Sequence, residues 1–451
     1  MRGLRSFVVL LVVGLGLGAY IYFVESKRAP SSEPEAKPKV FDGVEADKIE
    51  EITIALKDGD RTTLTKTGTD WQIVEPLKTA ADATEASGLA TNLSTLETRH
   101  VVDENPAELK EFGLAEPRAE VSFRLAGTKE PKRLLIGNKT ATGGDVYAKV
   151  GPEKRVILIP GYLESTFVRS TFDMRDKTAL KFERDKADGL TIVAGGKTIR
   201  TKKDAGEWML TEPIAARADF GMVEGLLGRL SGAQMKSIVS AAAPSDADLK
   251  KYGLAAPAIT VRVGAGSAQA ALALGADAGD GNLYARDLSR PPVFTLESAL
   301  ADELKKGGAD FRRKDLFEFR TFNAKRVEIT RDGGTIVFER VENKDPKAPS
   351  TDKWVQSAPA KKDADMAKMD AMLSAFSNLR AQSFADATAG TGVDTPALTM
   401  VVRYDDGKKE ERVTFGVRGD NVHAARAGEP GVMKIEKTDY EGAVKALNEV
   451  K

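Results

Sequence analysis

The 451-residue sequence contains no cysteine and only two histidines. Without cysteine, disulfide frameworks, thiolate metal sites, cysteine nucleophiles and a lipid-modified N-terminal cysteine are all excluded. With two histidines, a transition-metal site would depend on carboxylates, which is an unusual ligand set for such a metal. Basic and acidic residues balance at 67 each. No cationic excess is therefore available to neutralise phosphates, and we expect no nucleic-acid partner.

Motifs that carry catalysis are also missing, since neither HExxH nor GxSxG occurs. Glycine-rich stretches at 189–198, 263–270 and 277–282 resemble nucleotide and calcium loops. The first has Thr191 where a phosphate-binding loop requires glycine, and the calcium-like loop lacks its closing glutamate. We therefore predict no catalytic, cofactor-binding or metal-binding residue and no cofactor.

A long apolar run is present only near the N-terminus. Residues 7–24 carry no charge, and twelve of these 18 residues are Phe, Val, Leu or Ile. Eighteen helical residues span about 27 Å, close to the roughly 30 Å hydrocarbon core of a bilayer. We predict a transmembrane anchor rather than a cleaved signal peptide, because apolar residues continue beyond the small residues where cleavage would occur.

The flanking segments suggest how the anchor is oriented. Residues 1–6 carry no folded mass, so we expect a cytoplasmic tail, a single pass through the inner membrane and an extracytoplasmic or periplasmic body. Gly14 and Gly18 form a GxxxG pair, which is typical of close helix packing, although glycine is common in membrane helices generally. Residues 25–40 are rich in proline, serine and charge and are predicted to be an extended linker.

The chain has only three tryptophans, and they mark an internal repeat. They lie 137 and 146 residues apart, and each is followed by proline five residues on and by aspartate six residues later. Downstream, "LKEFGLAEP" is echoed by "LKKYGLAAP", and "LLIG", "LALG" and "VTFG" recur in the same order. Ordered anchors in three copies indicate a triplicated unit. The repeat anchors are Trp71, Trp208, Trp354, Pro76, Pro213, Pro359, Asp82, Asp219 and Asp365.

The sequence pattern within one unit predicts a hairpin, then a strand that carries the tryptophan, then a helix and three or four further strands. Proline cannot donate to a sheet ladder and should end the strand, and aspartate should cap the helix. In the first unit, Glu85 should complete a capping box. The tryptophan is interpreted as a core residue between sheet and helix, with a ligand platform as the alternative.

The predicted fold is α+β, with three tandem homologous units of about 140 residues after the transmembrane helix. Each unit is expected to be a largely antiparallel sheet with a packed helix. The unit boundaries are placed at 41–178, 179–316 and 317–451, the third unit being the most divergent.

A basic motif recurs between units. "DMRDKTAL" (173–180) and "DFRRKDLF" (310–317) align Arg175 with Arg312 and Lys177 with Lys314. We interpret this junction as a helix C-terminal cap that sets the angle between units. The alternative is that it binds a ligand.

The N-terminal segment, the "W…EP…AD" core and the "LKxFGLAEP" element together resemble a bacterial family of unknown function. Its members are single-span membrane proteins commonly encoded beside gliding-motility-type ABC transporter permeases. The resemblance covers nearly all of residues 40–451, and its motifs carry no assigned activity. From the anchor, the modular body and the missing catalytic motifs, with that gene neighbourhood as an analogy, we expect a non-enzymatic accessory or scaffold protein of an ABC-type export or cell-surface complex. Two alternatives stay open. One is a lipid or hydrophobic-ligand carrier, which needs a continuous apolar cavity, and the other is a glycan-acting enzyme, which needs carboxyl groups about 5 to 9 Å apart.

Overall fold

A computed structural model describes residues 22–23, 38–341 and 352–450. The predicted tail, almost all of the predicted anchor including Gly14 and Gly18, and most of the predicted linker lie outside these residues. Within the described residues, no helix is both long enough and apolar enough to span a bilayer. The chain divides into two compact units between Lys177 and Thr178, and each is described by itself.

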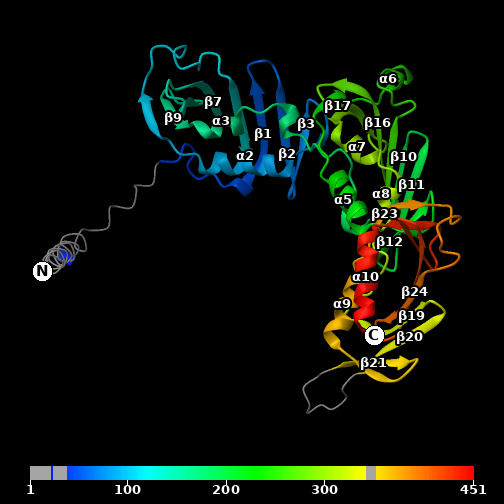
Figure 1. Ribbon diagram of the computed structural model, residues 1–451. Coiled ribbons are helices and arrows are strands. Elements are labelled where there is room, and N and C mark those ends of the chain that lie inside the picture. The colour runs from blue at the N-terminus through cyan, green and yellow to red at the C-terminus, as the bar shows by residue number, and fades with distance from the viewer. Residues whose placement is uncertain (1–21, 24–37, 342–351, 451) are drawn as a thin grey trace, which may run out of the picture. The chain divides into compact units, whose positions relative to one another are not determined.

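The first compact unit contains one nine-stranded antiparallel sheet (Figure 1). Its strands are β1 (Ile49–Leu56), β2 (Arg61–Thr67), β3 (Asp70–Glu75), β4 (Thr79–Ala80), β5 (His100–Asp103), β6 (Ala119–Leu125), β7 (Lys132–Lys139), β8 (Asp145–Val150) and β9 (Val156–Pro160). They lie in the order β4-β3-β2-β1-β6-β7-β8-β9-β5.

The second compact unit contains two further nine-stranded sheets with the same strand order. The second sheet is built from β10 (Gly189–Ala194), β11 (Lys197–Asp204), β12 (Glu207–Glu212), β13 (Ala216–Arg217), β14 (Ser237–Ser240), β15 (Ile259–Ala265), β16 (Ala268–Gly279), β17 (Asn282–Asp287) and β18 (Val293–Glu297). The third is built from β19 (Ala324–Arg331), β20 (Gly334–Val341), β21 (Lys353–Ala358), β22 (Lys362–Ala364), β23 (Ala381–Ala385), β24 (Leu398–Tyr404), β25 (Lys409–Arg418), β26 (Asn421–Arg426) and β27 (Val432–Ile435). The predicted triplication and antiparallel sheets are therefore confirmed, and the fold is mostly sheet.

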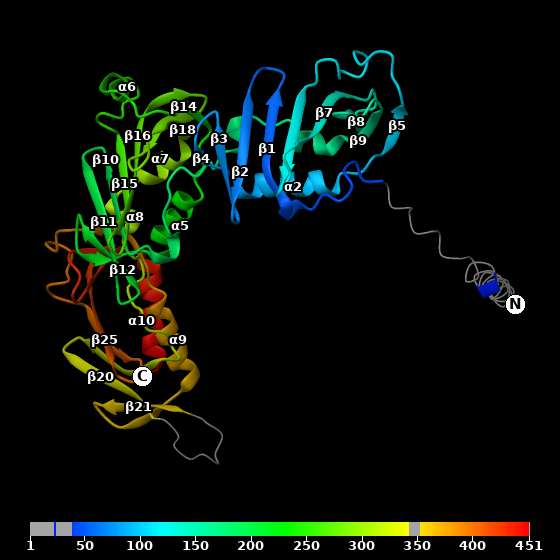
Figure 2. The same cartoon turned by 180° about the vertical axis from the view of Figure 1, so that it is seen from behind.

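One helix of 12 or 13 residues follows the fourth strand of each sheet: α2 (Ala83–Thr95), α5 (Phe220–Ser231) and α9 (Met366–Ser377). In the third repeat, α9 packs against the C-terminal helix α10 (Lys437–Val450), and Figure 2 shows the two side by side. The shorter helices are η2 (Ala46–Lys48), η3 (Gly161–Leu163), α3 (Glu164–Phe167), α4 (Thr171–Met174), η4 (Arg184–Lys186), α6 (Asp246–Lys251), α7 (Ala299–Leu304) and α8 (Gly308–Phe311).

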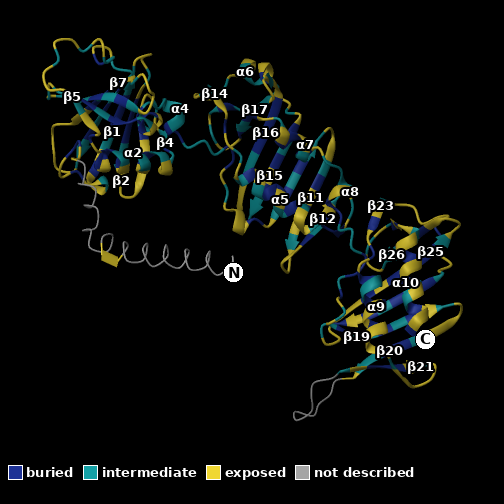
Figure 3. Cartoon of the chain, turned by 60° about the vertical axis from the view of Figure 1, so that its left-hand side comes forward, coloured by how far each residue is buried: buried dark blue, intermediate teal, exposed yellow. Residues whose placement is uncertain are grey.

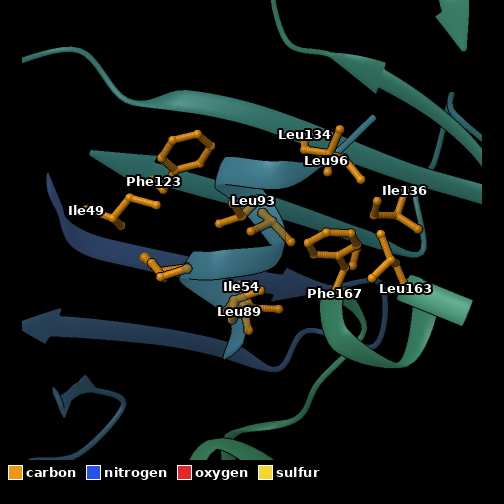
Figure 4. Packing of buried hydrophobic residues seen from close by; sticks show 14 of the residues in the cluster. Ile49, Ile54, Leu89, Leu93, Leu96, Phe123, Leu134, Ile136, Leu163 and Phe167 are labelled. Carbon is orange, nitrogen blue, oxygen red and sulfur yellow. The ribbon is translucent and has the colours of Figure 1, made fainter. Parts of the chain in front are cut away.

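Each sheet buries one face against its helices. In the first repeat, Leu89 and Leu93 of α2 lie among the side chains of the sheet and beside Phe167 of α3 (Figure 4). Figure 3 shows the resulting alternation of buried and exposed residues along the strands. Three apolar side chains of this size contribute on the order of 2 kcal/mol each when they are removed from water.

The three tryptophans lie in these cores. Trp71, Trp208 and Trp354 are 4%, 2% and 0% exposed, respectively. Each lies near the start of its strand, in β3, β12 or β21, and the residue two positions on is also buried. In the third repeat that residue is Gln356, whose amide Nε2 donates to the Ala360 carbonyl at 3.1 Å. A polar side chain is thus accommodated at a core position because its donor is satisfied.

The prolines and aspartates act at the two ends of the connection that follows. β3, β12 and β21 each end at the residue before the proline, and all three peptide bonds to proline are cis. The Asp82 carboxylate accepts from the Thr84 and Glu85 amides, at 2.9 and 3.1 Å. Asp219 and Asp365 cap α5 and α9 in the same way. These residues therefore set where the strand stops and where the helix begins.

The capping box predicted for Glu85 does not form within the described first repeat. The Asp82 amide that Glu85 would accept from donates instead to the Met174 carbonyl, at 2.9 Å. The carboxylate of Glu85 lies 2.9 Å from Arg169. A backbone contact between segments far apart in sequence has therefore displaced a local one.

The recurring glycine of "LLIG", "LALG" and "VTFG" is explained by close backbone contact. A Cβ at Gly137 or Gly275 would collide with the carbonyl of Phe112 or Tyr252, and one at Gly416 with the backbone around Gly392. These carbonyls belong to the loop that carries the "FGLAEP" motif. The two recurring motifs are therefore one packing contact, which only glycine permits.

The tryptophans differ in one hydrogen bond. The Trp208 indole Nε1 donates to Glu224 of α5 at 2.9 Å. The Trp354 Nε1 is buried without an acceptor among the described residues. Glu224 and Asp370 both lie five residues after the capping aspartate, but the shorter Asp370 side chain is exposed.

We expect Asp370→Glu to stabilise the third repeat by about 1 kcal/mol, because the longer side chain supplies an acceptor to a buried donor. Urea unfolding of the full chain measures the change. In a Trp354→Phe background the donor is absent, and the gain should disappear. An equal gain in both backgrounds would contradict the assignment.

Candidate functional site

The basic motif at 173–180 is called the first junction, and the one at 310–317 the second junction. The second junction connects the second and third repeats by backbone hydrogen bonds inside the second compact unit. On one side, the Arg313 amide donates to the Arg217 carbonyl at 2.9 Å. On the other, the Ala381 amide donates to the Lys314 carbonyl at 2.8 Å. Arg312 is the residue that follows the last turn of α8. The junction is thus an added strand-like segment between two sheets.

The first junction begins in the same way within the first compact unit. Arg175 follows α4 and forms an isolated bridge with Ala81. The Lys177 ammonium donates to the Asp173 carbonyl at 3.1 Å and lies 5.7 Å from the Phe172 ring centroid. Arg175 and Arg312 are both buried, with exposed fractions of 7% and 3%. They are therefore not surface charges.

A buried ionic network surrounds the second junction. The Arg217 guanidinium contacts Glu429, lies 3.2 Å from Glu318 and donates to the Asp315 carbonyl at 2.8 Å. The side chains of Arg217 and Glu429 are 9% and 8% exposed. Glu429 belongs to the turn between β26 and β27. The network therefore joins β13, the edge strand of the second sheet, to the turn between β26 and β27 in the third sheet.

A second arginine extends this network. Arg426 lies 3.3 Å from Glu429 and 3.4 Å from Glu411, and it donates to the Leu316 carbonyl at 3.1 Å. Both carboxylate oxygens of Glu411 accept the Glu318 amide, at 2.9 and 3.0 Å. Each buried acid is thus matched by an arginine or a backbone donor, as buried charges require.

The network shifts the pKa values of its members. Burial alone would raise the pKa of Glu318, but the charge and hydrogen bond of Arg217, together with Arg313 and Arg426, hold it below its usual 4.5. Burial raises the pKa of Tyr404, and the nearby carboxylates of Glu411 and Glu318 add to that effect. Glu318 is therefore ionised and Tyr404 is neutral at physiological pH.

A cavity of about 580 Å³ opens beside this network in the second compact unit. Strands β10 and β11, the connection after β12, the segment from α7 to α8 and the end of β23 form its walls. The lining residues are Ile192, Ala194, Lys197, Thr198, Ile199, Pro213, Ile214, Leu304, Lys305, Lys306, Gly307, Gly308, Ala309, Arg312, Phe384 and Asp386. Such a volume is typical of a small-molecule site.

The cavity brings two sequence-predicted residues together, Pro213 and Arg312. Burial lowers the pKa of Arg312, the charges of Glu429 and Asp386 partly restore it, and Arg217 lowers it further. The pKa of free arginine is high enough that the guanidinium nevertheless stays charged. The cavity therefore has a cationic wall at the junction.

The titratable side chains that line this cavity are Lys197, Lys305, Lys306, Arg312 and Asp386. Among the described residues, no cluster of three or more His, Asp or Glu side chains could hold a metal ion. His100 and His423 lie in different repeats, and His423 is in β26 at the strand position that Tyr147 and Tyr284 occupy in the other sheets. The described lining of the cavity is therefore mostly cationic, with one acidic residue.

Disruption of the network tests its role in joining the repeats. We expect Glu429→Gln to destabilise the second compact unit by about 3 kcal/mol, because Arg217 would stay buried with its charge poorly compensated. Urea unfolding followed by tryptophan fluorescence measures this. Glu410→Gln, which removes an exposed pair with Arg403, serves as the control and should change stability by less than about 1 kcal/mol. Equal effects would show that the network does not join the repeats.

The network also predicts a pH dependence. Because the folded pKa of Glu318 is lowered, its stabilising contribution is complete above the unfolded value of 4.5 and is lost as pH falls through the folded value. The stability difference between the natural chain and Glu318→Gln should therefore shrink as pH drops below 4.5. Urea midpoints across that range measure it, and a pH-independent difference would refute the assignment.

Similar solved structures include three of the DNA polymerase sliding clamp (DNA polymerase III subunit beta) from Pseudomonas aeruginosa, one of them bound to griselimycin. They align with 86 to 89% of this chain and 91 to 93% of their own, at 8 to 10% identity. The TM-score is 0.15 in each case. That value does not establish a common fold.

Comparison by sequence is more informative. No curated protein matches the chain. One family model, a domain of unknown function called DUF4340, matches twice, at residues 71–209 and 208–396. The first match begins at Trp71 and the second at Trp208, so the family's own unit recurs within this chain. The chain therefore belongs to the DUF4340 family.

Proposed function

We propose that this protein is a non-enzymatic scaffold, anchored in the inner membrane by residues 7–24, whose extracytoplasmic body binds a partner membrane complex. An ABC-type export system or a cell-surface complex is the partner class that the resemblance to single-span accessory proteins implies. The observation that carries the proposal is the use of the repeated residues. Tryptophan, proline, aspartate and glycine each recur three times. The tryptophans pack in the cores, the prolines end strands, the aspartates cap helices and the glycines allow close backbone contact. The repetition has therefore preserved the packing of each unit, which supports a structural framework for a partner rather than a catalytic site.

Two alternatives fit the geometry less well. A lipid carrier would need an apolar cavity that continues through the repeats, whereas the cavity described above is confined to the boundary of the second and third. A glycan-acting enzyme would need two carboxyl groups about 5 to 9 Å apart in a cleft. Asp386 is the one acidic residue among the described residues that line this cavity.

Photo-crosslinking in the native membrane tests the proposal. A photoreactive amino acid placed at an exposed aromatic position, Phe322 or Tyr162, replaces side chains that are 74% and 73% exposed. We expect the full chain to crosslink to one multi-span membrane protein and to co-purify with it. The same crosslink should persist when residues 7–24 are replaced by an unrelated transmembrane segment, because the body makes the contact.

Two results would overturn the scaffold proposal. The first is that no membrane protein is captured from either position or with soluble crosslinkers of different lengths. The second is that capture depends on residues 7–24 alone, which would assign the contact to the anchor.

A further inference from the structure

The cavity between the second and third repeats has an apolar wall. Its accessible apolar side chains are Pro213 and Ile214, after β12, and Phe384 of β23. Ile192, Ile199 and Leu304 also belong to the lining but are 1%, 5% and 0% exposed. An apolar chain placed here would leave water at about 25 cal/mol for each Å² that it buries. The wall therefore favours a ligand with a hydrocarbon part.

The rest of the lining is cationic. Lys197, Lys305, Lys306 and Arg312 face one acidic residue, Asp386. Lys305 and Lys306 pair with Asp302 and Glu303 on α7, and these acids are not among the lining residues. The Lys305 pair is exposed, and such pairs contribute at most about 1 kcal/mol, so the Lys305 ammonium group is available to an anion.

Arg312 supplies the observation that points to a ligand. Its side chain is buried, its guanidinium lies 4.1 Å from the Phe384 ring centroid, and its Nη2 donates to the Pro430 carbonyl at 3.1 Å. Its Nε has no acceptor among the described residues. Leaving a buried donor unpaired costs about 1 to 3 kcal/mol. The planar guanidinium is suited to the oxygens of a carboxylate or phosphate.

We propose that this cavity binds an amphipathic anion, a carboxylate or phosphate group carried on an apolar chain. The head group meets Arg312 and the lysines, and the chain lies against Pro213, Ile214 and Phe384. This site does not depend on the scaffold function. Arg312 of the second junction then has two roles, one in ligand binding and one in the packing of the fold.

Calorimetry on the full chain in phosphatidylcholine nanodiscs, with empty nanodiscs as the blank, tests the chemistry. Octyl phosphate should bind, and octanol and inorganic phosphate should each bind at least about tenfold more weakly, since each lacks one of the two contacts. If octanol binds as tightly as octyl phosphate, the anionic part of the proposal fails. If inorganic phosphate does so, the apolar part fails. Absence of binding by all three refutes the site.

Variants test the location. Lys305→Gln with Lys306→Gln should weaken octyl phosphate binding about tenfold, and Arg312→Lys should weaken it similarly because Nε is lost. Thr198→Trp should block the chain-binding part of the cavity. The matched control is Lys250→Gln with Lys251→Gln on α6, two consecutive lysines away from the cavity. If the control weakens binding as much as the lysine pair of the cavity, the location is wrong, whether or not Arg312→Lys folds.

A competition arm distinguishes the source of the ligand. Vesicles of phosphatidylglycerol are added to the octyl phosphate titration. Competition identifies a membrane lipid as the occupant, whereas unchanged binding identifies a free amphiphile. Both results support the same recognition chemistry.

Discussion

Burial of one tryptophan between a sheet and a helix is the constraint on which each repeat depends. The indole fixes how closely the helix approaches the sheet. The proline five residues on then ends the strand, and the capping aspartate begins the helix at a defined position. The aspartate amide also donates to the end of the short helix before the junction, from Asp82 to Met174 and from Asp219 to Phe311. One packing contact thus fixes the strand, the helix and the segment that leads to the next repeat.

At the boundary between the second and third repeats, the packed strands also hold a buried network of ion pairs. Among the described residues, Arg217, Arg426 and their acidic partners satisfy one another by ion pairs, and these contacts join the second and third sheets. Arg312 differs, because it lines a cavity and its Nε is unpaired among the described residues. The ion-paired arginines Arg217 and Arg426 therefore form the structural part of this boundary. Arg312, whose Nε lacks an acceptor among the described residues, belongs to the part that we propose binds a ligand.

Sequence reasoning predicts what is local and repeated. The tryptophan strands, their ends and the helix caps follow from residue type and spacing, and the short outer strands β4 and β13 are missed because two residues carry no periodicity. The Glu85 capping box fails because Met174, 92 residues away, takes the Asp82 amide. Arg217 pairs with Glu429, which is 212 residues away in the sequence. The one sequence feature that indicates a special role for Arg217 is that the first repeat has Ala80 at the equivalent position. Of the cavity, the sequence marks Pro213 and the recurring junction arginine Arg312, whereas the rest of the lining comes from segments of two repeats whose meeting no local pattern predicts.

The central claim is that the repeated residues serve packing and that the tryptophans are not a ligand platform. Acrylamide quenching of the intrinsic fluorescence of the full chain tests this most directly, since all emission from tryptophan comes from these three side chains. The account predicts that quenching of every tryptophan is far weaker than that of free indole and is unchanged when ligands or membranes are added. A tryptophan quenched as efficiently as free indole, or protected only after a ligand binds, would contradict it.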